Sequence, residues 1–226
     1  MSPPSVDPSA FVHPTALIEA GVSIGAGTKV WDNVHVRGPA TSIGTECIVG
    51  EKTYIAYDVS IGDRVKVNAF VYICALVTIE DGVMISAGTT FTNDMFPRAT
   101  TPDLVSLLPS APDENTLATV VRSGATIGAR TTIGCDLEIG RWAMTGMGSV
   151  VTRSVPPFHL VVGTPARSIA CVCRCGLPFV RFGAASGHGP PDGEWRCGRC
   201  SRSYRTTTGL VTELDGVPGL DGDLGR

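Results

Sequence analysis

The chain has 226 residues, which is enough for one large domain or for a domain with an appendage. Its formal net charge of −3 provides no broad basic field, so the composition argues against nucleic acid or an anionic membrane as a partner. The longest apolar run, residues 70–79, is too short to span a bilayer, and no signal-peptide pattern is evident, so we expect a cytoplasmic protein.

Residues 1–10 are expected to form a flexible leader, and a six-residue period follows them. Six is neither the helical period nor a strand alternation, and a fixed longer period indicates stacked repeats. Residues 11–154 therefore predict an all-β domain, a parallel β-helix in which short strands stack on their copies to share one core. The inward positions are Val12, Ile18, Ile24, Val30 and Val36, then, after one extra residue within 37–42, Ile43, Val49, Ile55, Ile61, Val67, Ile73, Ile79, Ile85 and Phe91.

Three repeats per coil place particular side chains above one another. Residues next to an inward position point outward by strand alternation. His35, Tyr54 and Tyr72 are therefore predicted to form an external ladder, flanked by Arg37. Asn93 falls three coils from His35, about 14 Å away by strand spacing.

The period stops after Phe91 and resumes at Val121. Residues 94–118 hold four prolines and are predicted to form an extruded loop, and so long a loop is more often functional than idle. The period then ends near Val151, and residues 155–170 are expected to connect the β-helix to a second module.

Cysteines crowd the C-terminal part of the chain. Cys173 and Cys175, then Cys197 and Cys200, form two short knuckles that could close a tetrahedral four-thiolate site. Such a closed site is typical of structural zinc, with reduced cysteines and no metal as the alternative. We predict a zinc-ribbon-like module over residues 171–210 and a flexible tail over residues 211–226.

Several segments resemble the hexapeptide-repeat acyltransferases, and most closely the N-acetyltransferases of nucleotide-linked amino sugars. They include FVHPTA (11–16), VWDNVHV (30–36), FTNDMFPRAT (91–100) and VVGTPAR (161–167). The resemblance implies a left-handed β-helix, a homotrimer, and acetyl-CoA bound between adjacent prisms. It also implies transfer of an acyl group, expected to be acetyl, to the amino group of a nucleotide-activated sugar.

Amide formation from a thioester needs a neutral amine and a proton acceptor, and an amine with a pKa near ~8 is already partly neutral. His35 is the candidate base or substrate hydrogen bonder, with Asn68 as a second catalytic candidate; surface and turn roles are the alternatives. The expected substrate-binding residues are Arg37, Tyr54, Asn93, Asp94 and Arg98, and the expected acyl-CoA-binding residues are Ala125, Ala143, Gly163 and Arg167.

Other functions remain open at the level of sequence. The same prism could serve an O-acyltransferase acting on another small acceptor, or a non-catalytic scaffold for assembly. A zinc hydratase would need three convergent histidines on the coil, where His35 alone is available, so that class is disfavoured.

Overall fold

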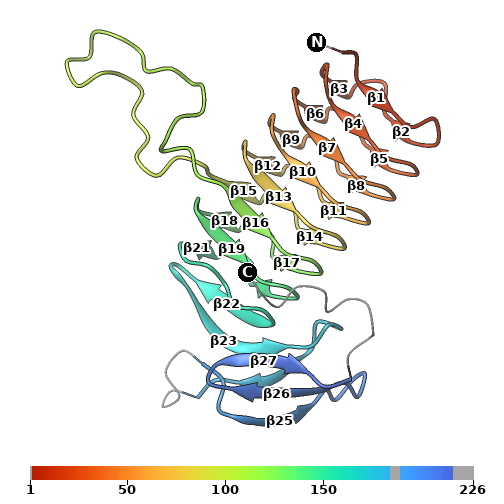
Figure 1. The fold of residues 1–226 in the computed structure, drawn as a ribbon, viewed down its shortest axis with the longest axis vertical. Helices are drawn as coiled ribbons and strands as arrows, with labels where there is room; N and C mark the ends of the chain where they lie inside the picture. The colour runs from red at the N-terminus through yellow and green to blue at the C-terminus, as the bar shows by residue number, and fades with distance from the viewer. Residues whose placement is uncertain (1, 184–188, 216–226) are drawn as a thin grey trace.

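The computed structural model describes residues 2–183 and 189–215. Within these ranges the regular secondary structure consists of β-strands, and they contain no helix long and apolar enough to cross a membrane. A tall prism of stacked coils carries an extruded loop on one side and a small β-module at its C-terminal end (Figure 1).

Three sheets form the sides of the prism. In the described residues each takes seven parallel strands from successive coils, and the second sheet has ten strands in all. The first sheet contains β1 (Ser5–Val6), β4 (Ser23–Ile24), β7 (Ser42–Ile43), β10 (Ser60–Ile61), β13 (Val77–Ile79), β16 (Thr119–Val121) and β19 (Leu137–Ile139). The second contains β2 (Phe11–Val12), β5 (Lys29–Val30), β8 (Ile48–Val49), β11 (Lys66–Val67), β14 (Met84–Ile85), β17 (Thr126–Ile127) and β20 (Met144–Thr145). The third contains β3 (Leu17–Ile18), β6 (His35–Val36), β9 (Tyr54–Ile55), β12 (Tyr72–Ile73), β15 (Thr90–Phe91), β18 (Thr132–Ile133) and β21 (Val150–Val151).

The core follows the six-residue period. In most coil strands the last residue is buried and the residue before it faces outward. Val36, Ile55, Ile73 and Phe91 are fully buried and stack in one column, as predicted. Buried threonines at the corners donate their hydroxyls to backbone oxygens, as Thr53 does to Asn68 (3.0 Å), so these hydroxyls do not remain unpaired in the apolar interior.

The extra residue between β6 and β7 changes one corner of the prism. Residues 19 apart pair across this step, whereas 18 separate the partners in the next coil. A Cβ on Gly38 would lie 1.9 Å from the Ala20 carbonyl oxygen, so a side chain there would force the two coils apart. This corner therefore requires glycine.

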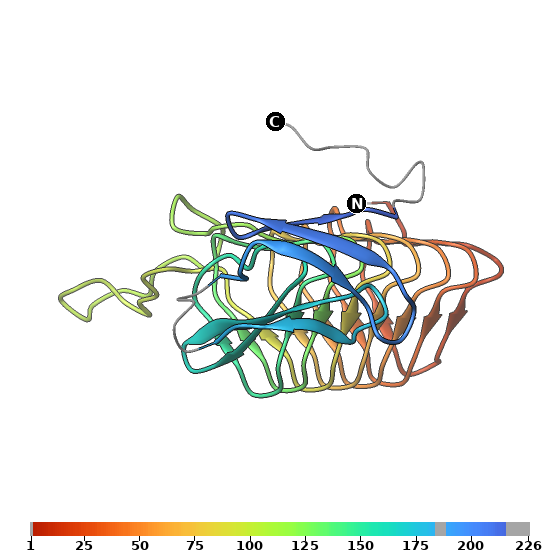
Figure 2. The same ribbon diagram turned by 90° about the horizontal axis from the view of Figure 1, so that it is seen from below.

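The C-terminal strands continue from the second sheet. β22 (His159–Gly163) pairs with β20, and β23 (Ala166–Val172) and β24 (Pro178–Arg181) add antiparallel strands beside it. A separate antiparallel sheet contains β25 (Gly193–Arg196), β26 (Ser203–Thr207) and β27 (Leu210–Glu213). Figure 2, which views the molecule from below, shows this module in front of the stacked coils, with the loop projecting to the left.

The fold class is confirmed: an all-β, left-handed parallel β-helix with an extruded loop and a cysteine-bearing appendage. Three boundaries differ from the prediction. Strand β1 pairs with β4, so Ser5 and Val6 begin the first coil and do not belong to a leader. Residues 159–163 and 166–170 form strands of the β22–β23 hairpin, and β27 extends to Glu213, inside the expected tail. The rest of that tail, from residue 216 on, lies outside the described residues.

Candidate functional site

The external ladder on the third sheet is confirmed. His35, Tyr54 and Tyr72 pair in register on β6, β9 and β12. The His35 ring meets the Tyr54 ring edge to face at 5.4 Å, and Tyr54 stacks on Tyr72 at 5.2 Å between ring centroids. The histidine therefore sits at the end of an aromatic row, on an outer face that a small molecule could reach.

Glu19 is the residue that the sequence analysis missed. It follows β3, and its Oε1 lies 2.8 Å from Nε2 of His35 and 3.4 Å from Nε of Arg37. The backbone N–H of Gly38 donates to its other oxygen at 3.2 Å. The hydrogen bond with His35 is the main cause that lowers the pKa of this carboxyl, so Glu19 is a carboxylate at neutral pH.

Arg37, which contacts Glu19, also lines a cavity beside the Glu19–His35 pair. Its guanidinium lies 3.4 Å from the Tyr54 hydroxyl and 5.5 Å from the centroid of the Tyr57 ring. The cavity has a volume of about 590 Å³, and its lining is formed by Glu19, Ala20, Arg37, Gly38, Pro39, Tyr57, Ala111 and Pro112. Because two lining residues belong to the loop, a segment leaving the prism at Phe91 returns to cover the corner near Pro39. The cavity is therefore built within a single chain.

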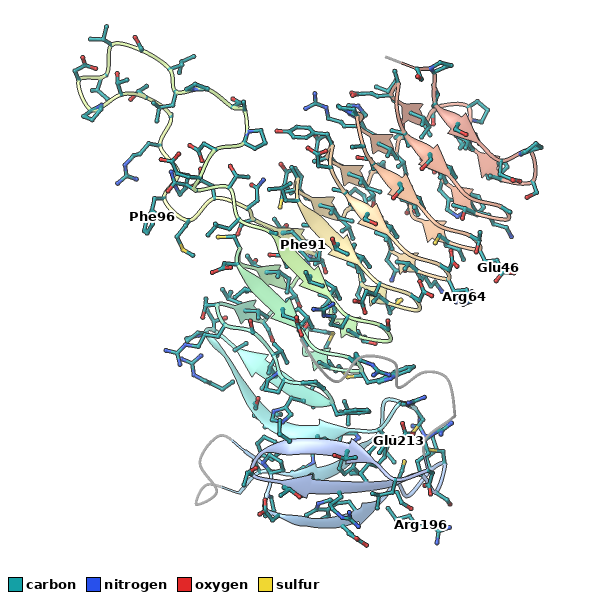
Figure 3. The ribbon with its side chains drawn as sticks, viewed as in Figure 1. Glu46, Arg64, Phe91, Phe96, Arg196 and Glu213 are labelled. Atoms are coloured by element: carbon teal, nitrogen blue, oxygen red, sulfur yellow. The ribbon has the colours of Figure 1, made fainter. Side chains whose placement is uncertain are left out.

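The loop base contains the other expected substrate-binding residues. Asn93 donates to the Ala75 oxygen at 3.5 Å, and Asp94 accepts from the Phe96 N–H at 2.8 Å. Arg98 donates to the carbonyl of its neighbour Pro97. In Figure 3, Phe91 lies on the coil and Phe96 on the loop beyond it. None of these contacts, within the described residues, brings Asn93, Asp94 or Arg98 to His35.

Asn68 lies at a different place from His35. It lines a second cavity of about 380 Å³, together with Trp31, Gly50, Glu51 and neighbouring residues at the corner that follows the second sheet. Its backbone is held by hydrogen bonds to Ile85 and Thr53. The structure does not bring the two expected catalytic residues into one cavity.

The expected acyl-CoA-binding residues occupy the C-terminal half of the prism. Ala125 and Ala143 are buried, and their N–H groups donate to the Arg122 and Gly140 oxygens. Gly163, with a φ of 101°, donates to the Ser149 hydroxyl at 3.2 Å. Gly163 and Arg167 lie in the β22–β23 hairpin, and the Arg167 guanidinium contacts the Ala166 oxygen.

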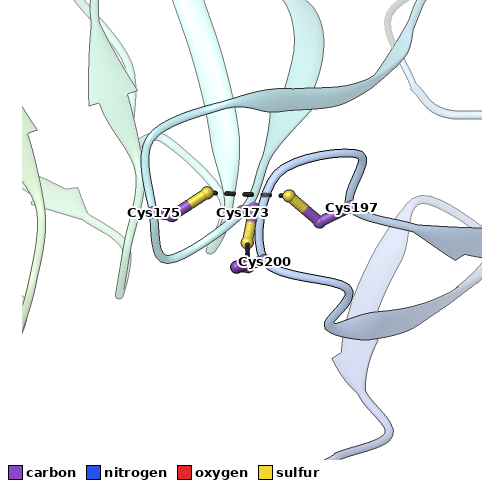
Figure 4. Close-up of side chains that lie close together, drawn as sticks. All are labelled: Cys173, Cys175, Cys197 and Cys200. Atoms are coloured by element: carbon purple, nitrogen blue, oxygen red, sulfur yellow. Dashed lines mark hydrogen bonds between the residues drawn. The ribbon is translucent and has the colours of Figure 1, made fainter.

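The four cysteines meet as predicted. Their sulfur atoms all lie within 4.8 Å of one another, with Cys173 and Cys200 at 3.3 Å and Cys175 and Cys197 at 3.6 Å (Figure 4). A tetrahedral zinc with bonds of about 2.3 Å needs sulfurs about 3.8 Å apart, so the arrangement fits the ion.

Hydrogen bonds and an ion pair connect the cysteine cluster to the appendage and to the last coil of the prism. The Tyr204 hydroxyl donates to the Cys173 sulfur at 3.1 Å and accepts from the Arg174 N–H at 3.2 Å. Arg174 forms a buried ion pair with Glu213 at 2.6 Å, and its guanidinium lies over the Trp142 ring of the prism at 5.1 Å. The cysteine cluster, a hydrophobic cluster and the final coil therefore form one packed unit.

No family model matches the chain. Over 98 residues, 42% of the chain, its sequence is 38% identical to dTDP-3-amino-3,6-dideoxy-alpha-D-galactopyranose 3-N-acetyltransferase from Aneurinibacillus thermoaerophilus, and the match covers 45% of that protein. Over 185 residues, 67% of the chain, it is 30% identical to the bifunctional protein GlmU of Rubrobacter xylanophilus, with 39% of that protein covered. The matched part thus spans less than half of either relative.

Two solved structures share the fold. One is a mutant of AntD, an N-acyltransferase from Bacillus cereus, in complex with dTDP and coenzyme A; it gives a TM-score of 0.52 at 22% identity over 75% of this chain and 85% of that chain. The other is UDP-N-acetylglucosamine acyltransferase from Francisella novicida, with a TM-score of 0.54 at 14% identity over 75% and 66%. At these identities the likeness establishes the fold.

Proposed function

The chain is a hexapeptide-repeat β-helix protein similar in sequence to acetyltransferases, and from that premise we propose that it is an acyl-CoA-dependent N-acyltransferase. Its acceptor is the amino group of a nucleotide-activated amino sugar. The observation that carries the proposal is the outward-facing His35, held against a carboxylate beside a cavity, in a chain similar to a dTDP-amino-sugar N-acetyltransferase.

In the proposed reaction His35 accepts a proton from the sugar ammonium, directly or through water. The neutral amine attacks the thioester carbonyl and a C–N bond forms. The C–S bond then breaks, the nitrogen gives its second proton to the departing sulfur, and coenzyme A leaves as the free thiol. The proton taken by His35 passes to solvent. Positioned acid–base groups of this kind typically contribute 10²–10⁴-fold to the rate. Arg37 and Tyr54 would contact the sugar nucleotide, because Tyr54 packs against His35 and Arg37 lies 3.4 Å from the Tyr54 hydroxyl.

The remaining site assignments extend this proposal along the prism. Asn93, Asp94 and Arg98 at the loop base would contact the diphosphate or the sugar, where Arg98 has the fork geometry that suits phosphate oxygens. Gly163 and Arg167 would hold acyl-CoA at the hairpin, with backbone groups near Ala125 and Ala143. Asn68 would act from the neighbouring cavity, separately from His35.

Zinc and assembly complete the proposal. Cys173, Cys175, Cys197 and Cys200 would hold one structural Zn²⁺, which the sulfur separations support. The active form would be a homotrimer with equivalent clefts, and the exposed apolar residues of the loop, Phe96, Leu104, Val105 and Leu107, would favour association. Light scattering at micromolar concentration should return the trimer mass, and a monomer mass would refute this assembly.

The direct test is a substrate panel. Purified protein would be incubated with acetyl-CoA and a series of dTDP- and UDP-linked amino sugars, starting with a dTDP-3-amino-3,6-dideoxyhexose. Free-thiol release reports turnover, and mass spectrometry of the product locates the acyl group. N-acylation of one amino sugar supports the proposal. Acylation of a hydroxyl instead would indicate the O-acyltransferase alternative, and no turnover together with no change of melting temperature by acetyl-CoA would favour a scaffold.

A further inference from the structure

We propose that Glu19 is a positioning residue that orients His35 and selects its tautomer, an inference that rests on the proposed function. The two side chains come from consecutive coils, and their 2.8 Å contact joins Oε1 of Glu19 to Nε2 of His35. No other side-chain contact of the described residues holds the His35 ring by a hydrogen bond. The glutamate is therefore the group that sets the direction of the imidazole.

The tautomer follows from the charge of Glu19. A carboxylate is an acceptor only, so Nε2 of neutral His35 must carry the proton that it donates. Nδ1 is then the nitrogen with the free lone pair, and it is the atom that can take a proton from the substrate ammonium. Loss of the carboxylate would let the ring turn and would release either nitrogen as the proton carrier.

Three donors keep the carboxylate in place. His35 and the Arg37 guanidinium both approach Oε1, and the Gly38 N–H donates to Oε2. The Gly38 contact depends on the extra residue of this corner, where a side chain on Gly38 would meet the Ala20 carbonyl. The insertion in the repeat therefore places a backbone donor against Glu19, and the pair is fixed before substrate binds.

The test compares Glu19→Gln with wild type and with Glu46→Gln, which removes an exposed carboxylate from a distant corner (Figure 3). Glu19→Gln should lower kcat/KM about 10- to 100-fold, a share of the 10²–10⁴-fold effect of a positioned base. Glu46→Gln should keep wild-type values. A loss of activity with an unchanged His35 tautomer would show a purely structural role and overturn the proposal.

A second readout does not depend on catalysis. The chain has four histidines, so nitrogen-15 labelling of histidine yields few signals, and His35→Asn identifies the one from His35. In wild type, the neutral His35 ring should carry its proton at Nε2, and Glu19→Gln should mix the tautomers. An unchanged tautomer in Glu19→Gln would overturn the role of Glu19 whatever the activity. Absence of acyl transfer by wild type with the expected tautomer shift would instead refute the proposed function.

Discussion

His35 depends on residues that lie one coil away on each side. Glu19 contacts its imidazole from the coil before, and Tyr54 from the coil after, so three strands that are distant in sequence build one site. None of the three would be placed by its own two-residue strand, because such a strand cannot hold a side chain in position without its stacked neighbours. The contacts that surround this histidine therefore exist only when the coils are stacked.

Replacement of His35 by asparagine should separate catalysis from binding. Asparagine keeps hydrogen bonding but cannot act as a base, so kcat/KM should fall roughly 10²–10⁴-fold. The loss should shrink as pH rises, because the substrate amine then deprotonates without help. The measurement is the pH profile of kcat and KM between pH 6 and 9.

Two other outcomes would assign His35 differently. A higher KM with little change in kcat would make it a substrate-binding residue. Wild-type values of both constants across the pH range would mean that His35 has no part in the reaction, and catalysis would then rest on backbone donors and positioning.

In the candidate site, only the side chains carried by the six-residue repeats could be placed from the sequence. The ladder of His35, Tyr54 and Tyr72 followed from counting residues, because stacking converts sequence spacing into contact. Glu19 could have been found in the same way: Ile18 pairs with Val36, so Glu19 lies beneath Arg37. The position of Ala111 and Pro112 in the lining of the cavity beside Pro39 could not be predicted, because the loop has no period that fixes its path.

At the scale of the elements, each coil strand contributes two or three residues, and its stability comes from stacking. The six-residue period predicted the strand positions and the single-residue insertion. It missed β1, because Val6 fits the period but lies among prolines and polar residues that suggested a leader. It also missed the β22–β23 hairpin, where alternation replaces the period of six. In this hairpin the His159 side chain contacts the Ser168 hydroxyl across the two strands.

His159 should make the attachment of the appendage sensitive to acid. Its ring is buried between the Ser168 hydroxyl at 3.0 Å and the Gly209 carbonyl at 3.3 Å, and burial lowers its pKa. The unfolded chain takes up this proton near pH 6.5, so below that pH the unfolded state binds more protons and the folded state loses stability. The slope can reach about 1.4 kcal/mol per pH unit for one proton.

The measurement is the melting temperature between pH 7.5 and 5.5, in wild type and in His159→Gln. Glutamine can donate to Gly209 but does not titrate in this range, so the acid-induced decrease should be smaller in the variant. The difference between the two curves removes contributions from exposed histidines and from the cysteines. Parallel curves would contradict the role of His159.

At the scale of the whole molecule, the appendage covers the C-terminal end of the prism. Phe158, Tyr204 and two of the cysteines form one hydrophobic cluster, against which Trp142 of the prism packs. Tyr204 is fully buried and stacks on Phe179 at 4.4 Å. A module of this size has little core of its own, so we expect its folding to depend on the proposed zinc and on this contact.

Purified protein should contain about one zinc per chain, the content expected of a single four-thiolate site. Chelation should increase hydrogen exchange over residues 171–183 and 189–210, while the coils stay protected, because their core does not include the cluster. Cys173→Ser should lose the zinc. Cys171→Ser, which alters a buried thiol on β23 outside the cluster, should retain it. Reduced, untagged wild type without zinc would refute the metal site.

The stacked coils also fix the distance between the two parts of the site. His35 and Thr90 lie three coils apart on the third sheet, so about 14 Å separates the histidine from the base of the loop. Deletion or duplication of one 18-residue coil between them would change this separation by about 4.8 Å and leave the packing within every other coil intact. If the proposed site spans His35 and the loop base, the length of the acceptor that it can hold is set by an integer, the number of coils, and can change in evolution or by design in equal steps.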